Sequence, residues 1–228
     1  MKKSLSSLFI AAIVSMTVVC VHAAEAVSEA VVINVKGGAQ ATLPGQSKSV
    51  EIKVGDKLPQ GTVIQTPGNS EVEIQAFSGS TTTIKPGSKV DLSKLSLTTA
   101  NGEITKQSAL IDLTIGTVVS TLDPSKKAIN DYAIRTPKGV AAARGTQYTV
   151  TVTGAGMVRV LVVTGVVRFT NSVTGQSVDV PAGFTVTIDA DGKISEPVEA
   201  SPEQQNAKSD EGASIQPVID ITIVSPSS

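Results

Sequence analysis

The sequence predicts an all-β protein, and three observations support that fold class. Residues 24–228 contain 27 Val and 23 Thr, and β-branched residues favour strands over helices. Apolar and polar residues alternate with a period of two, as Val72 and Ile74 do against Glu71 and Glu73. Turn signals that contain Gly recur at short intervals. Many short strands between Gly turns indicate a single-domain, β-solenoid-like stack of short strands, with a β-sandwich as the alternative.

The first 23 residues have the pattern of a secretory signal peptide. Lys2 and Lys3 precede an apolar run over residues 8–21, and the small residues Ala23 and Ala24 follow. We therefore expect cleavage between Ala23 and Ala24, and a periplasmic or extracellular product. An uncleaved membrane anchor is the alternative, but the apolar run is short for a bilayer span. No second run is long enough, so we expect no membrane span after signal removal.

The composition excludes several classes of function. Cys20 and His22 are the only Cys and His in the chain, and both lie in the predicted signal peptide. Without them a thiolate–imidazole zinc site, a Cys nucleophile and a Ser/His/Asp triad are all impossible. We therefore expect no catalytic residue, no metal site and no cofactor. A net charge of -1 gives no reason to expect nucleic-acid binding.

The predicted domain extends from residue 24 to residue 195. In chain order, alternating segments predict strands at 71–76, 147–152, 158–163 and 184–188. Segment 189–193 has acidic residues that faintly resemble a calcium loop, but the later oxygen ligands are missing, so we expect a hairpin turn there. Further turns are predicted at 54–56, 60–61, 67–69, 78–80, 86–88, 101–102, 154–156, 164–165, 174–175 and 181–183.

The composition changes after Ser195. Residues 196–217 contain three Pro and five acidic residues against one Lys, which is typical of a flexible, solvated linker. Residues 218–224 then alternate again between apolar and polar side chains. This run is either a strand that returns to the edge of the domain or a short peptide for a partner. We therefore assign 196–228 as a tail with a possible terminal strand.

The most specific motif lies between Tyr132 and Val150. An extended segment leads into Thr-Pro, a Gly, a run of small residues and then Arg-Gly-Thr before a new strand. This order resembles the FecR-type domain, and supporting pieces extend the resemblance over about residues 35–188. The signature residues are Thr136, Pro137, Gly139, Arg144, Gly145 and Thr146.

The signature residues are expected to be structural. Pro137 pushes Thr136 toward an extended conformation, and Gly139 permits a sharp reversal. The alanines at 141–143 allow neighbouring backbone to come close. Arg144 stands among small residues, so we expect its guanidinium to be buried against carbonyl oxygens or carboxylates. It either organises the turn or presents a charge, and we favour the structural role.

The resemblance also implies a location and a role. Proteins similar to FecR regulators join a cytosolic segment that binds a sigma factor, one membrane span and a periplasmic domain of this kind. Here the apolar run begins close to the first residue, so we expect the cytosolic segment to be absent. What remains resembles the periplasmic module alone, in a β-solenoid-like body.

Three functions remain open at this point. The first is a non-enzymatic protein-interaction module of the bacterial cell envelope, whose partner is an envelope protein bound at strand edges or on a concave sheet face. The alternative is a structural domain that binds glycan or the cell wall, although few aromatic rings are available to stack on sugars. A hydrolase or lyase comes third.

Overall fold

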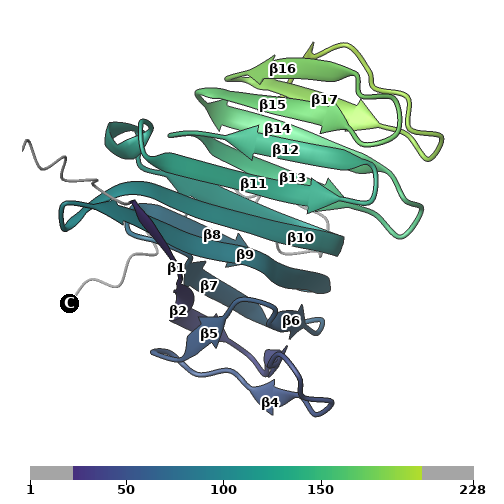
Figure 1. The fold of residues 1–228 in the computed structure, drawn as a ribbon. Coiled ribbons are helices and arrows are strands. Elements are labelled where there is room, and N and C mark those ends of the chain that lie inside the picture. Colours follow the sequence, from purple (N-terminus) through teal and green to yellow (C-terminus); the bar gives the residue numbers. More distant parts are fainter. Residues whose placement is uncertain (1–22, 202–228) are drawn as a thin grey trace, which may run out of the picture.

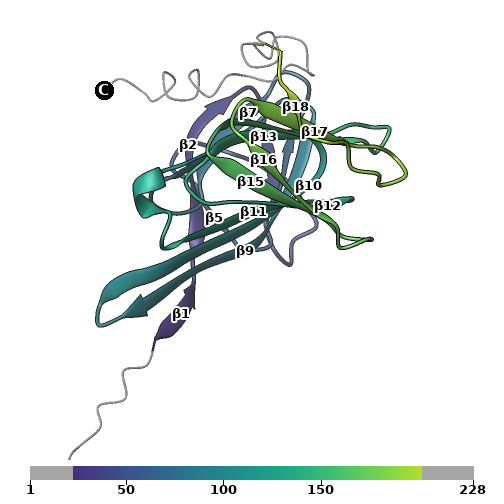
Figure 2. The same cartoon turned by 90° about the horizontal axis from the view of Figure 1, so that it is seen from above.

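The computed structural model describes residues 23–201, which form two β-sheets packed face to face (Figures 1 and 2). The all-β prediction is confirmed. A single turn of 3-10 helix, η1 (Pro124–Lys126), is the one helical element among the described residues. No helix within this range is long and apolar enough to cross a bilayer. Within residues 23–201 the strand pairings never return to their starting strand, so in this part of the chain the two sheets are open at both ends.

Each sheet is a long ladder of short strands. In spatial order, the first sheet contains β4 (Val50–Glu51), β3 (Gln40–Thr42), β6 (Val63–Thr66), β9 (Ser88–Ala100), β10 (Glu103–Leu122), β11 (Asn130–Thr136), β12 (Gly139–Ala143), β15 (Val166–Asn171) and β16 (Ser177–Pro181), with β1 (Ala24–Val27) along the far end of β9. The second contains β5 (Lys57–Pro59), β2 (Glu29–Lys36), β7 (Glu71–Gln75), β8 (Ser80–Ile84), the end of β10, β13 (Gln147–Val152), β14 (Val158–Thr164), β17 (Phe184–Ile188) and β18 (Val198–Glu199).

The chain advances along one axis while it alternates between the two sheets (Figure 1). It forms a hairpin in one sheet and then a hairpin in the other, as in β11–β12, β13–β14 and β15–β16. This progression is solenoid-like, whereas the two facing sheets are those of a sandwich. Neighbouring strands are antiparallel throughout the described part, except for the parallel pair β10–β11. The predicted turns at 154–156 and 189–193 close hairpins, as expected.

Strand β10 belongs to both sheets. Its first part pairs with β9 and β11 in the first sheet, and from Gly116 onward it pairs with β8 and β13 in the second. Gly116 has φ +99°, a conformation that costs little only for glycine. A Cβ there would lie 2.5 Å from Ser88 Cα. The strand can therefore change sheets only because residue 116 has no side chain.

A hydrogen-bonded corner holds this crossing in place. Ser88 Oγ accepts from Thr117 N at 2.9 Å and donates to Thr117 O at 3.2 Å. Thr66 Oγ1 accepts from Ser88 N at 3.1 Å and donates to Lys85 O at 2.6 Å. All of these side chains are buried. Buried hydroxyls that are fully bonded rigidify the backbone that they connect.

Tyr132 ties the two sheets together inside the core. It projects from β11 of the first sheet, and its hydroxyl lies 2.6 Å from Thr82 Oγ1 and 2.9 Å from Ser120 Oγ, both on strands of the second sheet. Burial raises the pKa of Tyr132 to about 12, so the hydroxyl keeps its proton. Phe77 packs edge-on against the ring at 6.1 Å. The remaining core is aliphatic and continuous along the stack.

Parts of the predicted tail and signal peptide lie outside the described residues. This applies to residues 1–22 and to residues 202–228, which include the run 218–224. Within the predicted linker, Val198 and Glu199 form β18 against β17, and Ala200 is buried. The ordered body therefore continues a few residues past Ser195.

The crossing gives a first prediction. Replacing Gly116 with Ala forces a side chain into a positive φ and against Ser88, so the free energy of unfolding should fall by roughly 2–5 kcal/mol in urea denaturation. Gly154→Ala is the matched control, because a Cβ there meets nothing within 4 Å. The control should change stability by less than about 1 kcal/mol. Equal effects at the two sites would contradict the role assigned to Gly116.

The two buried tyrosines give a second prediction. Tyr132→Phe removes the partner of two buried hydroxyls and should cost roughly 1–3 kcal/mol. The Tyr148 hydroxyl is equally buried but has no hydrogen-bond partner within residues 23–201. Tyr148→Phe should therefore leave stability unchanged or raise it by up to about 1 kcal/mol. Adding Thr82→Val and Ser120→Ala to Tyr132→Phe should recover most of the loss. If both Tyr→Phe variants lose stability equally, the Tyr132 tie is not the cause.

Candidate functional site

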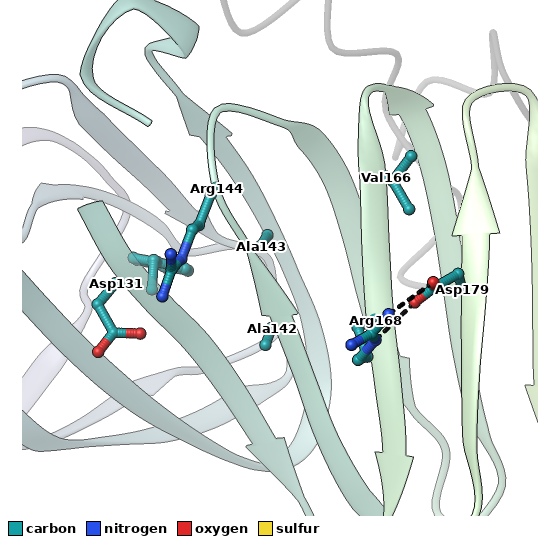
Figure 3. A pocket seen from close by; sticks show the side chains of 8 residues that line it. Asp131, Ala142, Ala143, Arg144, Val166, Arg168 and Asp179 are labelled. Atoms are coloured by element: carbon teal, nitrogen blue, oxygen red, sulfur yellow. Dashed lines mark hydrogen bonds and ion pairs between the residues drawn. The ribbon is translucent and has the colours of Figure 1, made fainter. Parts of the chain in front are cut away.

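A shallow groove of about 410 Å³ crosses the outer face of the first sheet over β11, β12, β15 and β16 (Figure 3). The FecR-like motif supplies much of its lining. Its residues are Asp131, Tyr132, Ala142, Ala143, Arg144, Val166, Arg168 and Asp179.

Strand register explains how the groove forms. Ala133, Ala142, Arg168 and Asp179 lie side by side on four neighbouring strands, because each is the direct partner of the next. Side chains in such a row share one face of the sheet. Ala142 makes a low floor, and the longer side chains of Arg168 and Asp179 that follow it along the row form a wall. The alternation of β12 turns Ala142 outward and Ala141 into the core.

Charged side chains of both signs border the floor. Arg168 donates to both carboxylate oxygens of Asp179, at 2.7 and 2.8 Å. These hydrogen bonds hold the pKa of Asp179 below its usual range. On the opposite border, Lys106 Nζ lies 2.7 Å from an Asp131 carboxylate oxygen. Both carboxylates of the groove are therefore committed to cations.

Arg144 lies differently from the sequence-based expectation. Its side chain is exposed at the end of β12, beside the groove, and makes no hydrogen bond or ion pair with any residue between 23 and 201 (Figure 3). The expected burial against carbonyl oxygens or carboxylates is wrong. The small neighbours mislead because the alternation of the strand, and not the size of adjacent residues, decides which side chains face solvent.

The Thr-Pro-Lys-Gly part of the motif is a tight turn between β11 and β12. Thr136 Oγ1 accepts from the backbone N–H groups of Lys138 and Gly139 and donates to Gly139 O at 2.9 Å. Pro137 is exposed at the tip. A Cβ on Gly139 would lie 2.6 Å from the Phe169 ring and would overlap Thr170 O. Gly139 therefore serves close packing of β12 on β15; the sharp reversal that the sequence suggested does not use a positive φ at this residue.

Gly145 and Thr146 connect the groove to the second sheet. Gly145 lies against Pro124 of η1, where a Cβ would come within 2.6 Å of Pro124 Cα. Thr146 is buried and its carbonyl accepts a hydrogen bond from Leu122 N at 2.9 Å, at the end of β10. The contacts of Thr136, Gly139, Gly145 and Thr146 are thus structural contacts, whereas Arg144 points to solvent.

The comparisons with known proteins agree with the motif. Residues 62–168 match the family model described as FecR protein. The match confirms the resemblance to the FecR-type domain over these residues. It includes every groove residue except Asp179. No curated protein matched the sequence.

The comparison with solved structures found similar chains. Two crystal structures of a "putative anti-sigma factor" from Parabacteroides distasonis are similar, each with 12% sequence identity and TM-scores of 0.50 and 0.49. Each match covers 62% of this chain and 61% of the other chain. At this identity, the match with the score of 0.50 indicates a shared fold and nothing more. The chain spans about three fifths of the length of these relatives.

The exposure of Arg144 gives a third prediction. Arg144→Ala should fold normally, with a free energy of unfolding within about 0.5 kcal/mol of the parent chain in urea denaturation. Gly139→Ala, five residues earlier in the same motif, should lose roughly 2 kcal/mol or more, because its Cβ has no room. Misfolding of Arg144→Ala would restore a structural role for this arginine.

Proposed function

We propose that the chain is a non-enzymatic protein-interaction module of the bacterial cell envelope, exported by the signal peptide at residues 1–23. The observation that carries the proposal is the exposed groove on the first sheet, lined by the FecR motif. In this proposal the chain makes contacts in the periplasm or outside the cell.

The shape of the groove favours an extended peptide segment as the bound part of the partner. Ala142 leaves room for side chains of the partner to reach the floor, and the flanking arginines and aspartates offer polar contacts along the rim. The exposed side chains of the lining lie on one face of a sheet and do not enclose a cavity (Figure 3). Such a surface suits a chain that lies across it better than a small molecule that must be surrounded.

Charge adds selectivity to this surface. Arg144 is the groove's one cation without an ionic partner inside residues 23–201. Its guanidinium can receive a carboxylate of the partner in a two-pronged hydrogen bond. Arg144 is exposed and has no ionic partner within residues 23–201, so binding costs it part of its hydration but breaks no ion pair in this part of the chain. We therefore propose an acidic residue in the partner segment opposite Arg144.

The edge of the first sheet offers a second contact of the same kind. Within the described residues, β16 pairs with β15 and has no strand on its other side. An extended segment can add there through main-chain hydrogen bonds, next to Asp179. Pro181 lacks an N–H, which limits this pairing to the first part of β16.

A retention experiment tests the proposed function. The chain is immobilised, a solubilised envelope extract of the source bacterium is passed over it, and retained proteins are quantified by mass spectrometry. Ala142→Arg fills the groove floor, so a specific partner should be retained at least about tenfold less. Ala155→Arg, at the exposed turn between β13 and β14, is the matched control and should retain the partner fully.

The alternative outcome is also defined. Binding of the parent chain to insoluble wall or polysaccharide, without a retained protein, would overturn the proposal and favour a glycan-binding structural domain. Retention of the same proteins by the parent chain and by Ala142→Arg would show that the groove is not the contact.

A further inference from the structure

Past the end of the groove, the FecR-like motif packs against η1 and forms a corner of the molecule. A Cβ on Gly145 would lie 2.6 Å from Pro124 Cα and 3.4 Å from Lys127 Cβ. The corner therefore brings Arg144, which precedes Gly145 in the chain, close to Lys127 at the end of η1. Consecutive Cα atoms are about 3.8 Å apart, so the Cβ atoms of Arg144 and Lys127 lie within roughly 10 Å of each other.

Hydrogen bonds hold η1 in this position. Asp123 N donates to Gly79 O at 2.8 Å, and Asp123 Oδ1 accepts from Ser125 N at 2.8 Å. Lys126 Nζ donates to Ser78 Oγ at 2.7 Å. The short helix is thus tied to the turn between β7 and β8 on one side and packs against Gly145 on the other.

Two carboxylates near η1 are already engaged by other side chains. Lys106 Nζ lies 2.7 Å from an Asp131 carboxylate oxygen. Hydrogen bonds from Ser125 lower the pKa of the Asp123 carboxyl, and the charge of Lys126 lowers this pKa further. Each of the two aspartates is therefore balanced by a lysine.

The charges of Arg144 and Lys127 are not balanced in this way. Both side chains are exposed, and neither forms an ion pair or a hydrogen bond with residues 23–201. The corner thus carries two uncompensated positive charges in a chain whose net charge is -1. An anionic group placed between a guanidinium and an ammonium is attracted to both.

We infer that this basic corner, made of Arg144 and Lys127, binds two acidic side chains of an extended protein segment. The inference rests on the proposed function and deepens it, because the segment that lies in the groove continues past Arg144 and over η1. Alternate residues of an extended chain point to one face and lie about 7 Å apart. Acidic residues at positions i and i+2 of the segment therefore match the two cations.

The two cations contribute differently to this recognition. The planar guanidinium of Arg144 fixes the direction of one carboxylate through two parallel hydrogen bonds. The ammonium of Lys127 acts as a point charge and accepts the second carboxylate from several directions. Because Gly145 and η1 fix both backbones, binding has to order only the two side chains, which keeps its entropic cost low.

Peptide binding tests the inference in the full chain. The probe is a fluorescein-labelled octapeptide of alternating Thr and Glu, and fluorescence anisotropy at low ionic strength reports its binding. Lys127→Glu and Arg144→Glu should each weaken binding at least about tenfold, because attraction becomes repulsion. Both side chains are exposed, so the two variants should fold normally.

The matched controls change the charge elsewhere or remove it from the probe. Lys57→Glu reverses an exposed charge on β5, at the other end of the stack (Figure 1), and should change binding by less than about twofold. An octapeptide of alternating Thr and Gln has the same shape without the charge and should not bind. Equal losses in Lys57→Glu and Lys127→Glu would indicate unspecific attraction and would overturn the inference.

The remaining outcomes separate this inference from the proposed function. If Lys127→Glu binds the acidic probe as the parent chain does, the basic corner is not the site, and the groove is still tested by the Ala142→Arg retention experiment. Loss of the probe in Lys127→Glu, with no protein retained from the extract, would support the corner and overturn the proposed function. Displacement of the probe by an equal concentration of inorganic phosphate would overturn the inference in favour of a small-anion site. Binding to phosphatidylglycerol vesicles that is lost in Lys127→Glu would overturn it in favour of a membrane surface.

Discussion

The passage of β10 from one sheet to the other is the constraint on which the architecture depends. One strand supplies pairing edges to both ladders, so the register of the first sheet fixes that of the second. The crossing combines Gly116, which has φ +99°, with Ser88, whose hydroxyl is hydrogen-bonded to both the N–H and the carbonyl of Thr117. Any side chain at Gly116 would push against Ser88 and separate the sheets.

The Tyr132 tie supports the same alignment from inside the core. Three hydroxyls on three strands satisfy one another, and a shift of one sheet relative to the other would leave all three without partners in an apolar interior. Aliphatic side chains alone tolerate such slippage, since their contacts are not directional. The polar cluster therefore gives the core a unique alignment, whereas the surrounding aliphatic residues supply most of its stability.

Much of the fold could be predicted from the sequence, because strand alternation and Gly turns are local signals. Val72 and Ile74 lie in the core as their period of two requires, and the FecR-like motif lies within the residues that match the FecR family model. The partition of strands between two sheets could not be predicted, since hairpins of either sheet have the same local pattern. The parallel pairing of β10 with β11 could not be predicted either, because it depends on the crossing of β10 between the sheets at Gly116.

The candidate site was only partly visible in the sequence. The motif indicated the right segment, but Arg144 was expected inside the protein and lies outside it. Arg168 and Asp179 were missed as groove residues because strand register brings them there: Arg168 pairs with Ala142 of β12, 26 residues away in sequence, and Asp179 pairs with Arg168. Strand pairing at that distance leaves no signal in a single sequence beyond the opposite charges of the pair.

The alternation of hairpins between two sheets also affects how the molecule comes apart. Each hairpin touches only the hairpins next to it along the axis, so stability is distributed as in a row of coupled units. Strands at the two ends, such as β4 and β16, have one neighbour each and open first. Local unfolding that starts at either end stops at β10, because β10 pairs in both sheets and cannot separate from one without separating from the other. The middle of the stack thus acts as a cooperative block, and the groove lies between that block and a fraying end, where local opening can admit an incoming strand.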